Sequence, residues 1–161
     1  MYQTKNSIPE HVRIQIAELL QEHLANSIDL VTQAKQAHWN VKGPDFIALH
    51  ELFDKVYQDS GNYVDLIAER IVQMGAIARG TLKSVMALTK LPEYPLDLLA
   101  GHQHLGVLAH TLAYYGESIR NGVLSANEVS DYTTADILTE ISRGVDKSLW
   151  LLEAHLQGHA R

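Results

Sequence analysis

The sequence predicts an all-α fold, a bundle of four long helices in which a long crossover with one short helix connects the second to the third. Four long segments repeat apolar residues every three or four positions, as helices that bury one face do. No segment shows the alternating apolar and polar pattern of a half-buried strand. Glycines and prolines between residues 75 and 95 indicate one long connection.

The first helix is predicted to begin at Ser7 and to run to about His38. Ser7 and Glu10 have the spacing of a capping box, in which the serine caps the helix and the glutamate reaches back to it. Apolar residues between positions 12 and 31 keep to one face. The Asn-Val-Lys-Gly-Pro turn at residues 40–44 should end this helix.

The second helix is expected to start after Asp45 and to end at Gly75, because aspartate favours the position before a helix and glycine the position after it. The connection from the first helix is only a few residues long, so these two helices should be antiparallel neighbours. The crossover at residues 75–95 has room for one short helix between residues 82 and 91.

The third long helix is predicted from about residue 96 to residue 121, with Gly122 ending it. The fourth should begin near Thr133 or Thr134 and end before Gly158, with Gly144 weakening its interior by about 1 kcal/mol. A single long crossover between the second and third helices is the connectivity of ferritin-like bundles.

Composition favours one globular domain over residues 1–161, with short tails at residues 1–7 and 158–161. Hydrophobic residues make up 46% of the chain and charged residues 20%, which excludes a disordered protein. The absence of cysteine means that a metal site must use imidazole and carboxylate ligands. Neither a signal peptide nor a membrane-spanning segment is predicted, so we expect a cytoplasmic protein, with association with the nucleoid as the alternative.

The second helix carries two pairs of potential metal ligands at i, i+4 spacing, which places each pair on one face. His50 and Asp54 form one pair, and Asp65 and Glu69 form the other. The pairs are 15 residues apart, about 60° around the axis and roughly 22 Å along it, so one metal ion cannot touch both. Taken alone, each pair is more often a solvated helix face than a ligand pair.

A second chain is the better source of the missing ligands than the same chain. A ferritin-type site within one chain would need Glu-x-x-His on two helices, and the sequence contains no Glu-x-x-His. If two copies of the second helix pack antiparallel about a two-fold axis, the His50 end of one meets the Asp65 end of the other. His38, at the end of the first helix, can then join a set of nitrogen and oxygen ligands suited to ferrous iron.

These helices carry two longer motifs, K-Q-A-H-W-N-V-K-G-P-D-F-I-A-L-H-E-L-F-D at residues 35–54 and D-L-I-A-E-R at residues 65–70. Both closely resemble motifs of the Dps family, the DNA-protection-during-starvation mini-ferritins. The similarity extends to Y-P-L-D at residues 94–97 and T-A-D-I-L-T at residues 134–139, so it covers essentially the whole chain.

This resemblance implies a ferroxidase, an enzyme that oxidises Fe²⁺ to Fe³⁺ with hydrogen peroxide as the preferred oxidant. It implies a hollow dodecamer built from two-fold dimers, which stores ferric iron and protects the cell from oxidative damage. The implied di-iron ligands are His38, His50 and Asp54 from one subunit and Asp65 and Glu69 from its two-fold partner. The resemblance also places Trp39 beside the site and makes Asp131 and Asp136 candidates for lining an iron-entry pore.

Two other functions compete with this prediction. A DNA-binding nucleoid protein is one, since the family includes members that compact DNA, often through lysine-rich tails. A net charge of −6 and a first segment with Lys5 as its single basic residue before Glu10 argue against it. A plain interaction scaffold is the other, but all five ligand positions are intact. The cluster of His102, His104 and His110 is interpreted as ordinary core or surface histidines.

Overall fold

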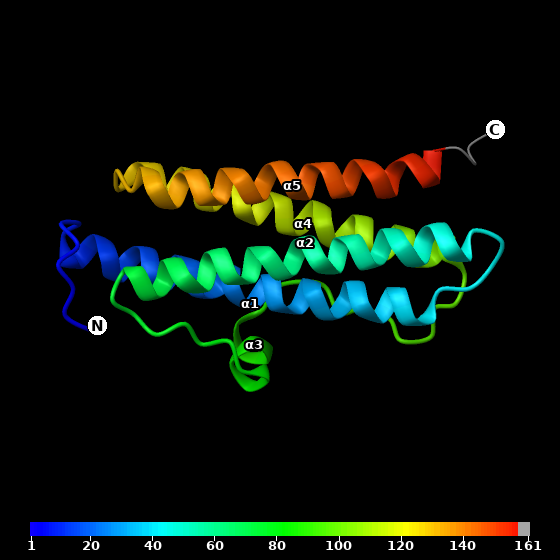
Figure 1. The fold of residues 1–161 in the computed structure, drawn as a ribbon, viewed down its shortest axis with the longest axis horizontal. Helices are drawn as coiled ribbons and strands as arrows, with labels where there is room; N and C mark the ends of the chain where they lie inside the picture. The colour runs from blue at the N-terminus through cyan, green and yellow to red at the C-terminus, as the bar shows by residue number, and fades with distance from the viewer. Residues whose placement is uncertain (158–161) are drawn as a thin grey trace.

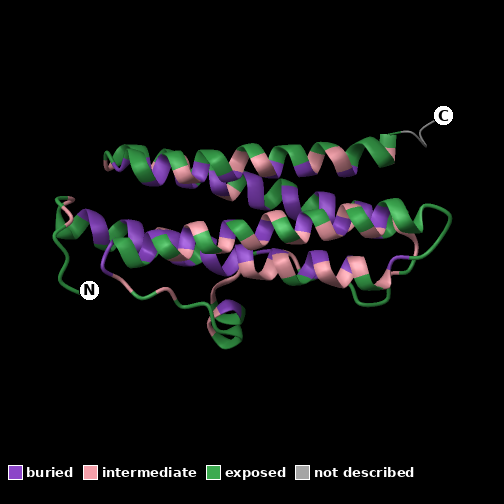
Figure 2. Ribbon diagram, viewed as in Figure 1, coloured by how far each residue is buried: buried purple, intermediate pink, exposed green. Residues whose placement is uncertain are grey.

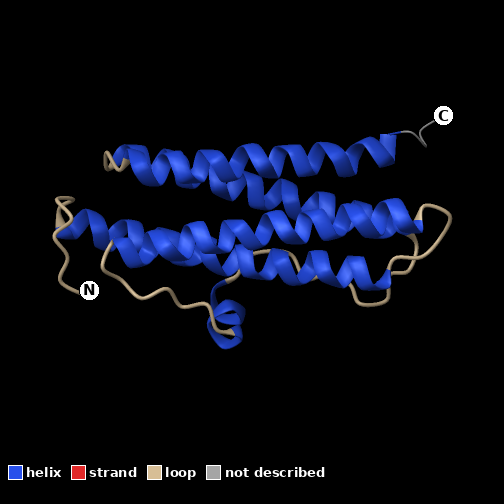
Figure 3. Ribbon diagram, viewed as in Figure 1, coloured by secondary structure: helices blue, strands red, loops and turns tan. Residues whose placement is uncertain are grey.

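The computed structural model describes residues 1–157 and is built from helices, with no strand in that part of the chain (Figure 3). The long helices are α1 (Glu10–Asn40), α2 (Phe46–Gln73), α4 (Gly101–Glu128) and α5 (Tyr132–Gln157), and the short α3 (Leu82–Leu88) lies in the crossover. Figure 1 shows the four long helices side by side, with α3 set off beside α1. The predicted all-α bundle with a long crossover is therefore confirmed.

The buried faces of the four long helices meet along the axis of the bundle (Figure 2), and a cluster of apolar side chains fills them. Helix α1 packs most extensively on α2, and α4 on α5. Fully buried side chains from every long helix fill the centre, each of which stabilises the fold by about 1.5–3 kcal/mol; they include Leu20, Phe53, Leu108 and Ile141. No helix within residues 1–157 is long and apolar enough to cross a lipid bilayer.

The start of α1 differs from the prediction of a capping box at Ser7. The helix begins at Glu10 with Pro9 in the cap position, and no side chain among residues 1–157 caps it. Asn6 organises the entry instead, because its Oδ1 accepts a hydrogen bond from the amide of Ile8 at 3.0 Å. A local side-chain bond of this kind competes with the cap that the sequence predicts.

Helix α4 begins and ends later than predicted, at Gly101 and Glu128. Residues 96 and 97 form a turn, and residues 98–100 then run beside the connection between α1 and α2, where the amide of Lys42 donates to the carbonyl of Leu99 at 2.9 Å. Gly122 does not end the helix. It lies inside α4, where an added Cβ would sit 2.5 Å from His23 Nε2, so glycine permits close packing on α1 there.

Polar side chains on one face of α1 hold the crossover in place. Gln21 bonds both backbone groups of Arg79, and Asp29 accepts a hydrogen bond from the Thr89 hydroxyl at 2.7 Å. Further along α1, Gln33 donates to the carbonyl of Pro92 at 3.0 Å. These bonds fix the course of the crossover, which composition alone could not predict.

Candidate metal centre

The turn between α1 and α2 brings two of the predicted ligands together. His38 lies in the last turn of α1, and His50 lies in the second turn of α2. Gly43 adopts a φ of +121° in this turn, a conformation that glycine adopts without strain. The two imidazole rings stack with their centroids 3.6 Å apart. Both rings are shielded but not fully buried.

Reciprocal hydrogen bonds orient the two imidazoles. Nδ1 of His38 lies 2.8 Å from the carbonyl oxygen of His50, and Nδ1 of His50 lies 2.9 Å from the carbonyl oxygen of His38. A carbonyl only accepts, so both Nδ1 atoms must carry the proton. The Nε2 lone pair is then available on each neutral ring, and this arrangement is typical of metal-ligating histidines.

Asp54 lies one turn after His50 and completes a group of three predicted ligands on the same part of the bundle. Its Oδ1 is 3.8 Å from His38 Nδ1, and its Oδ2 accepts a hydrogen bond from Gln58 at 2.8 Å. Lys35 of α1 donates to Oδ1 at 2.5 Å. The hydrogen bond from Lys35 is the largest cause that lowers the pKa of the Asp54 carboxyl, so the group is a carboxylate at neutral pH.

Sequence reasoning missed Lys35, although its position was informative. Lys35 precedes His38 by three residues on α1, which places both on one helix face. Its ammonium also lies 4.3 Å from the centroid of the Tyr57 ring, a cation–π arrangement. The side chain therefore places a positive charge where a metal cation would approach Asp54.

Asp65 and Glu69 are not brought to this group. Both are exposed on the later part of α2, at the distance along the helix that the sequence predicts. Among residues 1–157, no three histidine, aspartate or glutamate side chains are arranged to hold a metal ion. Within one subunit, the five predicted ligands therefore lie in two separate groups.

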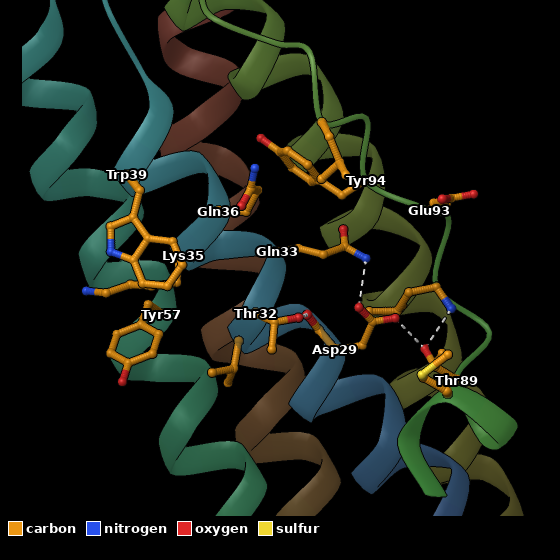
Figure 4. Close-up of a pocket in the computed structure, with 14 residues that line it drawn as sticks. Asp29, Thr32, Gln33, Lys35, Gln36, Trp39, Tyr57, Thr89, Glu93 and Tyr94 are labelled. Carbon is orange, nitrogen blue, oxygen red and sulfur yellow. Dashed lines mark hydrogen bonds between the residues drawn. The ribbon is translucent and has the colours of Figure 1, made fainter. Parts of the chain in front are cut away.

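Trp39 lies next to the histidine pair and is 67% exposed. It lines a cavity of about 900 Å³ together with Lys35 and Tyr57 on one side, and with Tyr94 of the crossover on the other (Figure 4). Lys35 therefore links this cavity to Asp54, because it lines the cavity and bonds that carboxylate.

Comparison with known proteins identifies the family. A ferritin-like domain model matches residues 17–161. The chain is 46% identical over 156 residues to the DNA protection during starvation protein of Agrobacterium fabrum, and the match covers 97% of this chain and 96% of that protein. The chain belongs to the Dps family. The resemblance stated from the two motifs is therefore confirmed.

Solved Dps structures share the whole fold. Dps from Microbacterium arborescens, in its high iron form, is 31% identical with a TM-score of 0.86, covering 96% of this chain and 98% of that one. Dps from Mycobacterium smegmatis is 27% identical with a TM-score of 0.91, covering 97% and 94%. The bundle is thus the ferritin-like fold of Dps proteins.

The two acidic residues predicted as pore candidates differ in this Dps chain. Asp131 is 3% exposed and caps α5, since its carboxylate accepts hydrogen bonds from the amide and the hydroxyl of Thr134. Arg70 of α2 also pairs with it at 2.8 Å. Asp136 is exposed on the first turns of α5. In the single subunit, Asp136 alone of the two presents a carboxylate to solvent.

Proposed function

We propose that this Dps protein oxidises Fe²⁺ with hydrogen peroxide at sites shared by two subunits, and stores Fe³⁺ inside a closed shell of twelve. The observation that carries the proposal is the separation of the predicted ligands into two groups, one at the turn between α1 and α2 and one farther along α2. His38, His50 and Asp54 cluster at one end, whereas Asp65 and Glu69 are exposed farther along the helix. Neither half is a complete site.

A two-fold axis between two α2 helices would complete both halves at once. If the helices pack antiparallel, each His50 end faces the Asp65 end of the other subunit, and two identical sites form. Large apolar side chains near the cavity support burial by a second copy, because such groups rarely remain exposed together. Trp39, Leu82, Met86 and Leu96 are 67%, 71%, 81% and 79% exposed.

The ligand chemistry suits the oxidation of iron by peroxide. Two Fe²⁺ ions bound at one site can pass two electrons to one peroxide, and two protons then convert it to two water molecules without releasing a radical. Carboxylates stabilise Fe³⁺ electrostatically, while two neutral imidazoles with free Nε2 atoms allow Fe²⁺ to enter. Binding at Asp54 would release Lys35, whose charge the incoming cation replaces. Exposed Asp136 is our candidate for lining a route of iron entry.

Ferrous titration without oxygen, followed by peroxide, tests this function. The expected result is rapid ferric absorbance with two Fe²⁺ oxidised per peroxide, in a particle that light scattering shows to be a large closed oligomer. His50→Ala should slow the oxidation sharply. His102→Ala is the matched control, because His102 is exposed on α4 outside the site. A stable monomer, or equal rates in both variants, would overturn the proposal.

Direct DNA binding is not part of the proposal, because the N-terminal segment is held on the bundle. The amide of Tyr2 donates to the carbonyl of Gly75 at 2.6 Å. Arg13, which is buried, donates to the carbonyls of Ile8 and Met74 and so ties the segment to the end of α2. With a net charge of −6, we expect little retardation of DNA in a gel at physiological salt.

A further inference from the structure

A buried tyrosine and a buried histidine form a short hydrogen bond that the proposed iron chemistry does not use. Tyr94 in the crossover and His104 on α4 are 7% and 1% exposed, and the tyrosine hydroxyl lies 2.5 Å from Nδ1 of the histidine. The stacked rings have centroids 6.1 Å apart. His104 also packs near Phe53, the residue before Asp54.

The direction of this hydrogen bond follows from counting buried polar groups. His104 Nε2 has no hydrogen-bond partner among residues 1–157. If Nδ1 donated, the buried Tyr94 hydroxyl would lack an acceptor and Nε2 would remain unpaired as well. With Tyr94 as donor, only one group is left unpaired, and unpaired buried groups are costly. The phenol proton therefore points at the Nδ1 lone pair.

The position of Tyr94 connects this pair to the candidate iron site. Tyr94 lines the cavity that Lys35, Trp39 and Tyr57 also line, and it faces them across that space (Figure 4). Lys35 in turn bonds Asp54. Trp39 is exposed and Tyr57 is half-buried, so water can take their protons when they are oxidised. Tyr94 is buried and needs a base inside the protein. His104 is that base.

We propose that Tyr94 and His104 form a proton-coupled redox relay that quenches one-electron oxidants produced when peroxide meets a half-filled iron site. This step rests on the proposed function. A single Fe²⁺ gives peroxide one electron and yields Fe³⁺, hydroxide and a hydroxyl radical. Tyr94 supplies the second electron, which reduces the radical to hydroxide, and its phenol proton moves to His104 Nδ1. A second Fe²⁺ then reduces the tyrosyl radical, and His104 returns the proton.

Burial supports each half of this step. It raises the pKa of the Tyr94 phenol, so the residue stays protonated until it is oxidised. Burial also lowers the pKa of His104, which keeps the imidazole neutral and able to accept a proton. The Leu98 carbonyl has the smaller, opposite effect and favours the protonated ring, although its geometry falls short of a full hydrogen bond to Nε2. Loss of an electron makes a phenol strongly acidic, so an imidazole with a lowered pKa still accepts its proton.

Electron paramagnetic resonance on native shells tests the pair without any substitution. Shells given one Fe²⁺ per site and then peroxide should trap a tyrosyl radical when frozen, and two Fe²⁺ per site should reduce it several-fold. Shells grown with ¹⁵N-histidine should show altered hyperfine coupling, because the radical oxygen bonds an imidazole. A tyrosyl radical that is insensitive to the histidine isotope would overturn the proposal.

A second arm separates failure of this relay from failure of the proposed iron function. Azide radicals made by pulse radiolysis oxidise the protein without iron, and the tyrosyl radical should again carry the histidine coupling. Tyr94→Phe and His104→Gln should each lower its yield or lifetime several-fold, whereas Tyr114→Phe, a partly exposed tyrosine on α4, should not. A coupled radical in this arm but none with iron would contradict the quenching role if the shells oxidise Fe²⁺ with peroxide, and would contradict the ferroxidase alone if they do not. No coupled radical in either arm would contradict the relay.

Discussion

Replacing His23 with glutamine should remove a large part of the acid sensitivity of the bundle. His23 lies on α1, is 3% exposed and packs against Gly122 of α4. Its Nε2 has no hydrogen-bond partner among residues 1–157, and Nδ1 lies 3.4 Å from the Ser118 hydroxyl. Burial lowers the pKa of His23 from 6.5 to about 4. The imidazole is therefore neutral in the folded protein at neutral pH.

The sign of the effect follows from the two protonation states. Well above pH 6.5 neither the folded nor the unfolded chain protonates His23, and the residue adds no pH dependence. Between pH 6.5 and about 4 the unfolded chain takes up a proton that the folded chain excludes, so stability falls as pH falls. A shift of this size corresponds to about 3 kcal/mol per subunit, since one pKa unit is worth ~1.4 kcal/mol.

Unfolding in guanidinium chloride between pH 7 and pH 4 measures this difference. All samples need one protein concentration, because subunit association contributes to the measured stability. Glu22 and Glu117 line the same cavity as His23 and are present in both proteins, so their contributions cancel when the variant is subtracted. His11→Gln, at an exposed position, is the control. Equal pH dependence in native protein and His23→Gln would refute the reasoning.

Four further substitutions should have separable effects. Gly122→Ala should lower the free energy of unfolding in urea by about 1–3 kcal/mol, because the new Cβ would lie 2.5 Å from a buried side chain. Gly106→Ala should raise it by up to ~1 kcal/mol, because no atom of residues 1–157 lies within 4 Å of the new Cβ. Arg70→Met should cost about 3–5 kcal/mol in the same assay, because Asp131 would stay buried without its partner; an unchanged midpoint would contradict this. Lys35→Met should tighten Fe²⁺ binding in anaerobic calorimetry, because a candidate carboxylate ligand loses its competing cation; weaker binding would show that the lysine assists the site.

Apolar periodicity predicted the bundle because burial of one helix face dominates its stability. The ends of the helices depend on smaller local terms, and there the prediction was less accurate. Gly122 resembled a helix terminus in the sequence, but tertiary packing against His23 uses the missing side chain instead. Ser7 resembled a helix cap in the sequence, but Asn6 makes the local hydrogen bond to Ile8 instead. Tertiary contacts decide such positions, and a single sequence does not contain them.

The candidate site was predictable to the extent that it depends on spacing within one helix or across a short turn. His50 and Asp54 follow from i, i+4 geometry, and His38 follows from the short connection between antiparallel helices. The hydrogen bonds from both Nδ1 atoms to carbonyls could not be predicted, because they depend on the backbone course of the turn. The Tyr94–His104 pair depends on the path of the crossover, which polar contacts with α1 determine.

Mixed shells test the central claim, that His50 and Glu69 act at one site across two subunits. Shells assembled from equal amounts of His50→Ala and Glu69→Ala subunits contain dimers in which one site carries both substitutions and the other carries neither. Random pairing makes half of the dimers mixed, so roughly a quarter of all sites should be native. Peroxide-driven Fe²⁺ oxidation should recover to about that fraction of the native rate, with mixing verified by mass spectrometry. Rates no higher than those of either parent, in shells shown to be mixed, would contradict the inter-subunit site.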